Sequence, residues 1–330
     1  MSNILINSFA GPYEFKHHRP RLLIVGYGDI GKRILKQKLK YPKSGKNRKH
    51  FYEHFRVIIV SRTGLSNLDQ ETILLLKSER VLELKLDLDI KENINKISKF
   101  PTYTIVLIPS QNSSKQTTDP RMKKLCLSIE KSFKGIKCRG VYVSTTGVYG
   151  NTFGKLVDET HQCEPTQLRS KRRLYNEKIF RYGPKFHILR VPGIYAINRL
   201  PIHRLKLNKP ALMASDDVYT NHIHAEDLAR ICFISLFKGK PSRTTNTVDD
   251  SKIKMADYFD EVAKAFNLPK TPRISIKDMN LLEKQNKISS MMASFFKESR
   301  LLKNERLKNE LKIALDHPNI VDYLRKISKK

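Results

Sequence analysis

A glycine-spaced turn at residues 26–31 constrains the fold of this 330-residue chain more than any other feature. The turn reads Gly-Tyr-Gly-Asp-Ile-Gly and directly follows the apolar run RLLIV at residues 21–25. A helical pattern begins at residue 29. Glycines at this spacing permit a tight turn, close approach of the backbone to a pyrophosphate, and close packing of helix on strand. The pattern therefore predicts a dinucleotide site at the start of a Rossmann-type domain, formed by Gly26, Tyr27, Gly28, Asp29, Ile30 and Gly31.

Strand-like and helical segments alternate along the chain, which is typical of a parallel sheet covered by helices. Apolar or alternating runs predict strands at 21–25, 56–60, 82–86, 103–108, 140–144 and 186–191. Helices are expected at 29–39, 121–133, 169–182, 225–237, 255–266 and 305–315. We therefore expect an α/β fold, a Rossmann-type doubly wound parallel sheet with a smaller, mainly C-terminal α/β cap. The expected domains are residues 1–195, onto which 220–240 pack back, and residues 196–330.

The residues that end the second expected strand indicate which dinucleotide is bound. An acidic residue there would accept a hydrogen bond from the ribose 2′-hydroxyl of NAD, but the strand ends in Ser61, Arg62 and Thr63. Arg62 can pair with a 2′-phosphate, Ser61 and Thr63 can donate to it, and no carboxylate repels it. We therefore expect NADP in preference to NAD. The alternative is an exposed arginine that stacks on adenine or binds nothing.

Asp87 and Leu88 follow the third expected strand and resemble the acidic turn that meets the adenine ring in dinucleotide-binding proteins. A cap at the start of the next helix explains the same residues equally well, because a helical pattern follows them. Both residues are candidate cofactor contacts, with this structural alternative beside them.

The formal charge of +31 makes nucleic acid a partner to be weighed, because a basic surface attracts phosphates. The basic residues are spread along the chain, however, and 41 lysines outnumber 22 arginines, as drift in an AT-rich genome would leave them. The densest cluster, residues 43–50, is expected to be a solvated loop insertion. We therefore expect no specific nucleic-acid site.

Cysteine usage and hydropathy favour a cytoplasmic location. The four cysteines form no CxxC pair and no spacing suited to a metal, so we expect a reduced compartment and no metal site. No stretch approaches the roughly 20 apolar residues of a membrane span. Residues 1–20 contain no apolar signal-peptide core, so we expect neither secretion nor a membrane partner.

Later motifs extend the pattern: STTGVYG at 144–150, VDE at 157–159, LRVPGIY at 189–195 and NHIHAEDLA at 221–229. Together with the glycine turn they resemble the extended short-chain dehydrogenase/reductase superfamily, in its NAD-dependent epimerase/dehydratase branch, over nearly the whole chain. This resemblance implies that Pro192 lies at the cofactor. TDPR at 118–121 and SRLLKNERL at 299–307 resemble an atypical subgroup that keeps the cofactor loop but lacks the usual active-site tyrosine and lysine.

In active members of this superfamily a Ser or Thr polarises the substrate hydroxyl, and the resemblance gives this role to Thr145. A tyrosine acts as general base, a lysine four residues later lowers its pKa, and a glutamate stands four residues after the lysine. Glu177 matches the glutamate, which puts Arg173 at the lysine position and Arg169 at the tyrosine position. A guanidinium stays protonated at physiological pH, so Arg169 cannot remove a proton.

Two functions therefore compete. The first is an epimerase/dehydratase-like oxidoreductase, NADP-preferring, that acts on a small molecule such as a sugar or nucleotide sugar. Arg169 and Arg173 would then stabilise negative charge instead of acting as bases. The second is a catalytically silent NADP-binding sensor or assembly protein. Another register would bring Lys171 or Tyr175 into the site, but it would not restore a tyrosine–lysine pair.

Further polar positions have both a functional and a structural interpretation. Tyr149 fits a packing position or a substrate pocket, and Arg190 fits a contact with a substrate phosphate or with an internal carboxylate. His222 and His224 fit a substrate wall, but for His224 and Asp227 a cap at the start of the following helix is the favoured interpretation.

Overall fold

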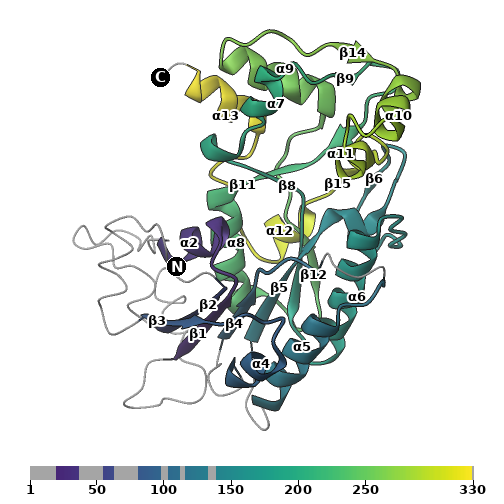
Figure 1. The fold of residues 1–330 in the computed structure, drawn as a ribbon. Helices are drawn as coiled ribbons and strands as arrows, with labels where there is room; N and C mark the ends of the chain where they lie inside the picture. Colours follow the sequence, from purple (N-terminus) through teal and green to yellow (C-terminus); the bar gives the residue numbers. More distant parts are fainter. Residues whose placement is uncertain are drawn as a thin grey trace, which may run out of the picture. The chain divides into compact units, whose positions relative to one another are not determined.

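The computed structural model describes residues 20–36, 55–62, 81–97, 103–111, 116–132 and 139–328 (Figure 1). The basic cluster at 43–50, Thr63 and Cys138 lie outside these ranges. The chain divides into two compact units that alternate along the sequence. Unit 1 comprises residues 1–144, 175–189 and 228–244, and unit 2 comprises 145–174, 190–227 and 245–330. The domain boundary that we expected at residue 195 stays a prediction.

A seven-stranded sheet, most of whose residues belong to unit 1, has the strand order β12-β7-β5-β4-β1-β2-β3. Its strands are β1 (Arg21–Val25), β2 (Arg56–Ser61), β3 (Val81–Lys85), β4 (Tyr103–Val106), β5 (Arg139–Thr145), β7 (His187–Val191) and β12 (Thr244–Asn246). β1 pairs in parallel with β2 and β4, and the pairs β2–β3 and β4–β5 are also parallel. The expected parallel sheet is confirmed, and its strand order reverses between β1 and β4.

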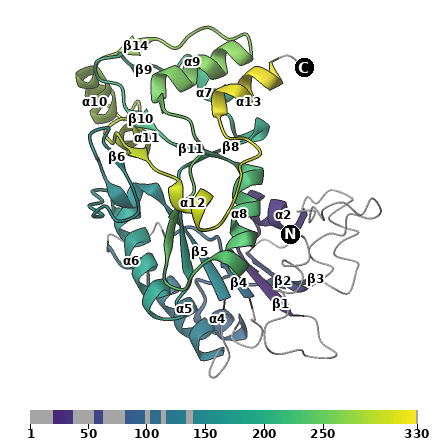
Figure 2. The same cartoon turned by 180° about the vertical axis from the view of Figure 1, so that it is seen from behind.

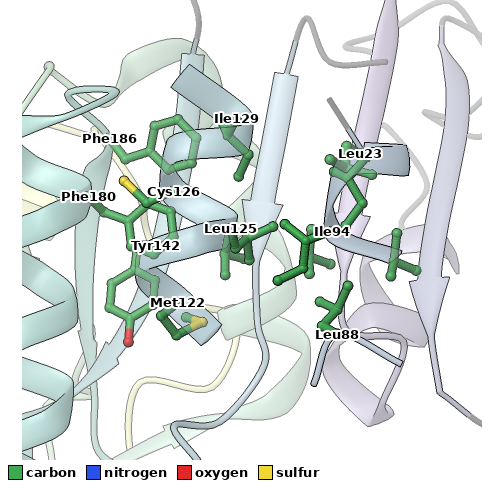
Figure 3. Close-up of a cluster of buried hydrophobic side chains, with 14 of the residues drawn as sticks. Leu23, Leu88, Ile94, Met122, Leu125, Cys126, Ile129, Tyr142, Phe180 and Phe186 are labelled. Atoms are coloured by element: carbon green, nitrogen blue, oxygen red, sulfur yellow. The ribbon is translucent and has the colours of Figure 1, made fainter. Parts of the chain in front are cut away.

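On one face of this sheet lie α4 (Lys91–Ile97), α5 (Pro120–Ser132) and the part of α6 (Leu168–Tyr182) that belongs to unit 1 (Figures 1 and 2). Alternate strand residues point to this face because successive side chains of a strand lie on opposite sides. Figure 3 shows part of the resulting core, whose members include Leu23, Val25, Ile58, Val60, Tyr142, Ile94, Met122, Leu125, Ile129 and Phe180.

The opposite face is covered by α2 (Asp29–Lys36) and α8 (Ala225–Lys238), which lie side by side in both views (Figures 1 and 2). The ring of Phe237 in α8 lies 5.3 Å from the ring of Tyr103 in β4. Phe233 of the same helix lies 6.1 Å from Phe55, just before β2. Helices on both faces explain why the strands are near-continuous apolar runs, as expected for a doubly wound sheet.

Two elements differ from the expectations. The strand expected at 82–86 is displaced by one residue, since β3 spans Val81–Lys85, and Leu82 is 48% exposed on this terminal strand. The helix expected at 305–315 is shorter: α12 (Glu305–Asn309) ends early. Lys312 adopts φ 53°, a left-handed conformation that cannot continue a right-handed helix, and the turn allows Leu311 and Ile313 to be buried.

Unit 2 consists of short elements, none of whose paired strands exceeds three residues in the described ranges. Its strand pairs are β8 (Gly193–Tyr195) with β11 (His222–His224), β6 (Leu156–Val157) with β15 (Leu301–Leu302), β9 (Ala211–Leu212) with β14 (Arg273–Ile274), and β10 (Tyr219–Thr220) with β13 (Ile253–Lys254). The larger apolar core joins α9 (Met255–Ala265) to α13 (Ile320–Ile327) and includes Phe259, Val262, Phe296 and Leu324.

A carboxylate is buried in unit 2 at Asp249, which is 4% exposed. Its Oδ1 accepts hydrogen bonds from the backbone N–H of Ser251, at 3.0 Å, and from the Ser251 hydroxyl. Burial raises the pKa of Asp249 to about 7, although hydrogen bonds from Ser251 and Tyr195 oppose the rise. Its folded-state pKa therefore lies well above the ordinary aspartate value of 3.8.

This shift predicts how stability depends on pH. Between about pH 4 and 7 the folded state binds the Asp249 proton more tightly than the unfolded chain does. The contribution of this group to the free energy of unfolding therefore falls as pH rises through this range, and it is level above pH 7. Asp249→Asn removes the titration. Relative to the variant, the wild type should lose on the order of 2 kcal/mol between pH 5 and 8, at 1.36 kcal/mol per unit of pKa shift. Urea unfolding of both proteins at each pH measures the difference, and parallel pH profiles would contradict the assignment.

Candidate functional site

The glycine turn lies at the carboxyl edge of the sheet in unit 1, where the strand order reverses. The backbone N–H of Gly26 donates to the carbonyl of Val60 at 3.0 Å, and the N–H of Leu107 donates to the carbonyl of Val25 at 2.9 Å. The turn is thus anchored to both neighbouring strands. In open α/β sheets the crevice at such a reversal is the usual ligand position.

The three glycines of the turn meet different surroundings. Gly26 has φ +106°, and a Cβ there would lie 2.9 Å from Cγ2 of Ile108. A Cβ on Gly31 would lie 2.6 Å from the carbonyl oxygen of Gly26, so α2 packs directly on the turn. A Cβ on Gly28 would meet no described atom within 4 Å, and Gly28 is exposed. Packing therefore explains Gly26 and Gly31, whereas Gly28 leaves open space at the start of a helix, where a pyrophosphate would fit.

The other residues of the turn have structural partners. Tyr27 is buried, with 8% of its surface exposed, and Ile30 is half-buried. The carboxylate of Asp29 forms an ion pair with Arg33 one turn later, at 3.0 Å. Asp29 stands in the first turn of α2, where negative charge is favourable to the helix dipole.

At the end of β2, Ser61 and Arg62 are placed on the same edge as the turn. The carbonyl of Ser61 accepts from the N–H of Leu86, which continues the pairing with the next strand. Its Oγ is buried and has no hydrogen-bond partner among the described residues. Arg62 is exposed. A buried hydroxyl of this kind next to an exposed guanidinium suits an anionic ligand group.

After β3, Asp87 organises the turn that leads into α4. Its Oδ1 accepts from the N–H of Asp89 at 2.9 Å, and its carbonyl accepts from Ile90 and from the Asn93 side chain. The side chain of Leu88 is 5% exposed and belongs to the apolar core. Only the backbone of Leu88 could therefore contact a cofactor.

The expected hydroxyl of Thr145 stands at the end of β5 and belongs to unit 2. Its Oγ1 accepts from the N–H of Gly147 at 3.2 Å and caps the 3₁₀ turn η2 (Thr146–Tyr149). A Cβ on Gly147 would lie 2.7 Å from Oγ of Ser170, so this turn packs on the first turn of α6. The cap uses a lone pair of Thr145 and leaves its O–H able to donate to a substrate oxygen.

Arg169, at the tyrosine position, is held by α11 (Ser290–Phe295). Its Nη2 donates to Oγ of Ser294 at 2.8 Å, and its guanidinium stacks 4.5 Å from the centre of the Phe295 ring. Burial lowers its pKa, Glu298 opposes this, and Arg300 adds to it. The guanidinium remains a cation, because even a lowered arginine pKa lies far above physiological pH.

Arg173 is half-buried on α6, and Pro192 is half-buried between β7 and β8. Ser294 and Phe295 were not expected from the sequence as partners of Arg169. No pattern in the sequence links residues separated by about 125 positions; only the nearby SRLLKNERL motif marks that region as distinctive.

The other polar candidates are mostly structural. Tyr149 is 1% exposed, donates to Asn246 at 2.8 Å and lies under the guanidinium of Arg190; burial raises its pKa to about 12. Asp227 accepts from the N–H groups of Asp316 and His317, at 2.9 and 2.8 Å. It therefore fastens the C-terminal segment.

Neither a metal site nor a membrane span emerges from the described part of the chain. Within residues 20–36, 55–62, 81–97, 103–111, 116–132 and 139–328, no group of three or more His, Cys, Asp and Glu side chains is placed to hold an ion. In the same ranges no helix is long and apolar enough to cross a bilayer.

The open space at Gly28 predicts a contrast between two glycine variants. Gly31→Ala should lower the free energy of unfolding by about 1–3 kcal/mol, because the new methyl group meets a backbone carbonyl that cannot rotate away. Gly28→Ala should change it by less than about 0.5 kcal/mol, since the methyl group meets no atom of the described residues. Guanidinium unfolding measures both values. Equal stability of the two variants would contradict the described packing.

Comparisons with known proteins bear on the fold. No protein-family model and no curated protein sequence matches the chain. A conserved protein of unknown function from Silicibacter pomeroyi has a structure with 21% identity and a TM-score of 0.67, covering 94% of this chain and 98% of its own. The dTDP-glucose 4,6-dehydratase DesIV from Streptomyces venezuelae, solved with NAD bound, has 15% identity and a TM-score of 0.69, covering 94% and 96%.

A third structure, UDP-N-acetylglucosamine 4-epimerase from Methanobrevibacter ruminantium in complex with UDP-N-acetylmuramic acid, has 15% identity and a TM-score of 0.67, covering 95% of this chain and 98% of its own. Sequence identities this low show a shared fold alone. Over nearly its whole length the chain therefore has the fold of nucleotide-sugar epimerases and dehydratases, as the sequence resemblance implies.

Proposed function

We propose that the chain binds NADP(H) at the carboxyl edge of the unit 1 sheet and acts as an epimerase/dehydratase-like oxidoreductase on a sugar or nucleotide sugar. The observation that carries the proposal is the open space at Gly28. Packing accounts for the other two glycines of the turn, but nothing in the described structure requires a glycine at this position. Close approach of the backbone to a pyrophosphate would require a glycine here.

The preference for NADP rests on the end of β2. The buried Oγ of Ser61, without a partner among the described residues, and the exposed guanidinium of Arg62 together suit a 2′-phosphate. The substrate class rests on the shared fold, since structural neighbours are enzymes of dTDP-glucose and UDP-N-acetylglucosamine. Thr145 would donate to a substrate oxygen, and Arg173 would hold charge near the cofactor.

A second function is favoured by the contacts of Arg169. The cation at the tyrosine position is tied to Ser294 and Phe295 and cannot serve as a base. A protein that binds NADP(H) without turnover, as a sensor or assembly partner, needs no base. We retain this silent NADP-binding protein as the alternative.

Titration calorimetry with NADPH and NADH tests the cofactor proposal. NADPH should bind the wild type at least tenfold more tightly than NADH, because Arg62 pairs with the 2′-phosphate. Arg62→Glu should invert the preference, since a carboxylate repels the phosphate and accepts from the ribose hydroxyl of NADH. Equal affinities for the two cofactors in the wild type would remove the claimed preference.

The same samples separate the two functions. With saturating NADP+ and a panel of nucleotide sugars, or with NADPH and 4-keto sugars, an oxidoreductase changes the absorbance of the reduced cofactor or converts the sugar. Chromatography of the sugar detects a reaction without net oxidation. Cofactor binding with neither change favours the silent protein.

A further inference from the structure

The TDPR motif at residues 118–121 marks the atypical subgroup in the sequence, but neither the core nor the proposed catalytic positions account for it. In the structure it begins α5 and contacts the loops that follow β3 and β4. All of these contacts lie within unit 1. The motif therefore acts at the edge of the sheet that carries the glycine turn.

Asp119 is a fully buried carboxylate, with 0% of its surface exposed. Its Oδ1 accepts from the N–H of Met122 at 3.1 Å and caps α5. Its Oδ2 accepts from the N–H of Gln111, at 3.1 Å, and from Nδ2 of Asn176 in α6, at 3.4 Å. A buried carboxylate with three donors holds its partners firmly, because releasing any of them leaves charge desolvated and unsatisfied.

Arg121 holds the same loop from a second direction. Its Nη2 donates to the carbonyl of Pro109 at 2.5 Å, and its Nη1 lies 3.5 Å from Oδ1 of Asp89, in the loop after β3. That carboxylate oxygen also accepts from Nε2 of Gln111 at 2.6 Å. Asp119 and Arg121 thus bind both sides of one short segment, residues 109–111.

This segment directly follows the residues that border the glycine turn. A Cβ on Gly26 would lie 2.9 Å from Cγ2 of Ile108 and 3.2 Å from its backbone nitrogen. A shift of the chain at Pro109 would therefore move Ile108 against the turn. Asn176 donates to Oγ of Ser110 at 3.2 Å and adds a third anchor to the segment.

We propose that Asp119 and Arg121 are positioning residues for the dinucleotide: they pin the loops after β3 and β4 so that the glycine turn keeps its binding shape without ligand. Holding a loop in its bound conformation improves affinity, because the ordering cost is removed from the binding step. This inference rests on the proposed NADP(H) binding and adds the residues that preorganise it.

Arg121→Met tests the inference, and Arg139→Met is its matched control. Nη1 of Arg139 likewise donates a hydrogen bond to a backbone carbonyl, that of Phe237, at 3.3 Å. Arg139 stands at the amino-terminal end of β5, however, and the glycine turn lies at the carboxyl edge of the sheet. Both variants lose one positive charge, so a general electrostatic effect on NADPH would be equal in the two. We expect Arg121→Met to raise the NADPH Kd about tenfold, and Arg139→Met to leave it within twofold of the wild type.

A conservative variant distinguishes positioning from a general loss of structure. Arg121→Lys keeps a cation beside Asp89 and one donor for Pro109, so it should recover part of the lost affinity while melting at a temperature similar to that of Arg121→Met. If Arg121→Met does not fold, Asp89→Asn replaces it, because Asp89 is exposed and its change removes the charge from both contacts. That variant should raise the Kd about threefold.

The outcomes separate the inference from the function on which it rests. If the wild type binds neither NADPH nor NADH, the proposed function fails, and this inference fails with it. If the wild type binds NADPH and Arg121→Met, or Asp89→Asn in its place, binds equally well, only the inference is overturned. An equal loss in Arg139→Met would also overturn it.

Discussion

The close approach of α2 to the turn after β1 is the contact on which the candidate site depends. Gly31 lies so near the carbonyl of Gly26 that any side chain would force the helix away from the strand. The helix begins directly at the turn, and N–H groups in the first turn of a helix have no partner within the helix, so they can serve an anion beside Gly28. Hydrogen bonds from the turn to β2 and from β4 to β1 hold this arrangement at the reversal of strand order.

The proposed pyrophosphate site and the proposed catalytic site depend on different kinds of features. The pyrophosphate site depends on backbone features, namely glycines and a helix start, whereas the expected NADP preference depends on the side chains of Ser61 and Arg62. The proposed catalytic site depends on side chains, and the position that the resemblance assigns to the tyrosine is Arg169, whose guanidinium contacts Ser294 and Phe295. A cation held in this way can stabilise negative charge on a ligand but cannot accept a proton.

The elements set by local pattern could be predicted from the sequence, and those set by distant contacts could not. β1 has the bounds that the run RLLIV predicted, because apolar strands buried on both faces leave a clear sequence signature. The helix expected at 305–315 ends at Asn309, and the chain then turns through a left-handed Lys312, a conformation that no helical periodicity reveals. The partners of Arg169, and the contact of Asp119 with Gln111, required the fold, since side chains meet there from separate elements.

Titration of NADPH into the wild type and Gly28→Ala tests the central claim most directly, because this substitution fills the space assigned to the pyrophosphate and touches no described atom. The account predicts that the wild type binds NADPH and that Gly28→Ala, with unchanged unfolding free energy, binds it at least tenfold more weakly. Equal binding by the two proteins, or no binding by the wild type, would contradict the assignment of the turn as a dinucleotide site.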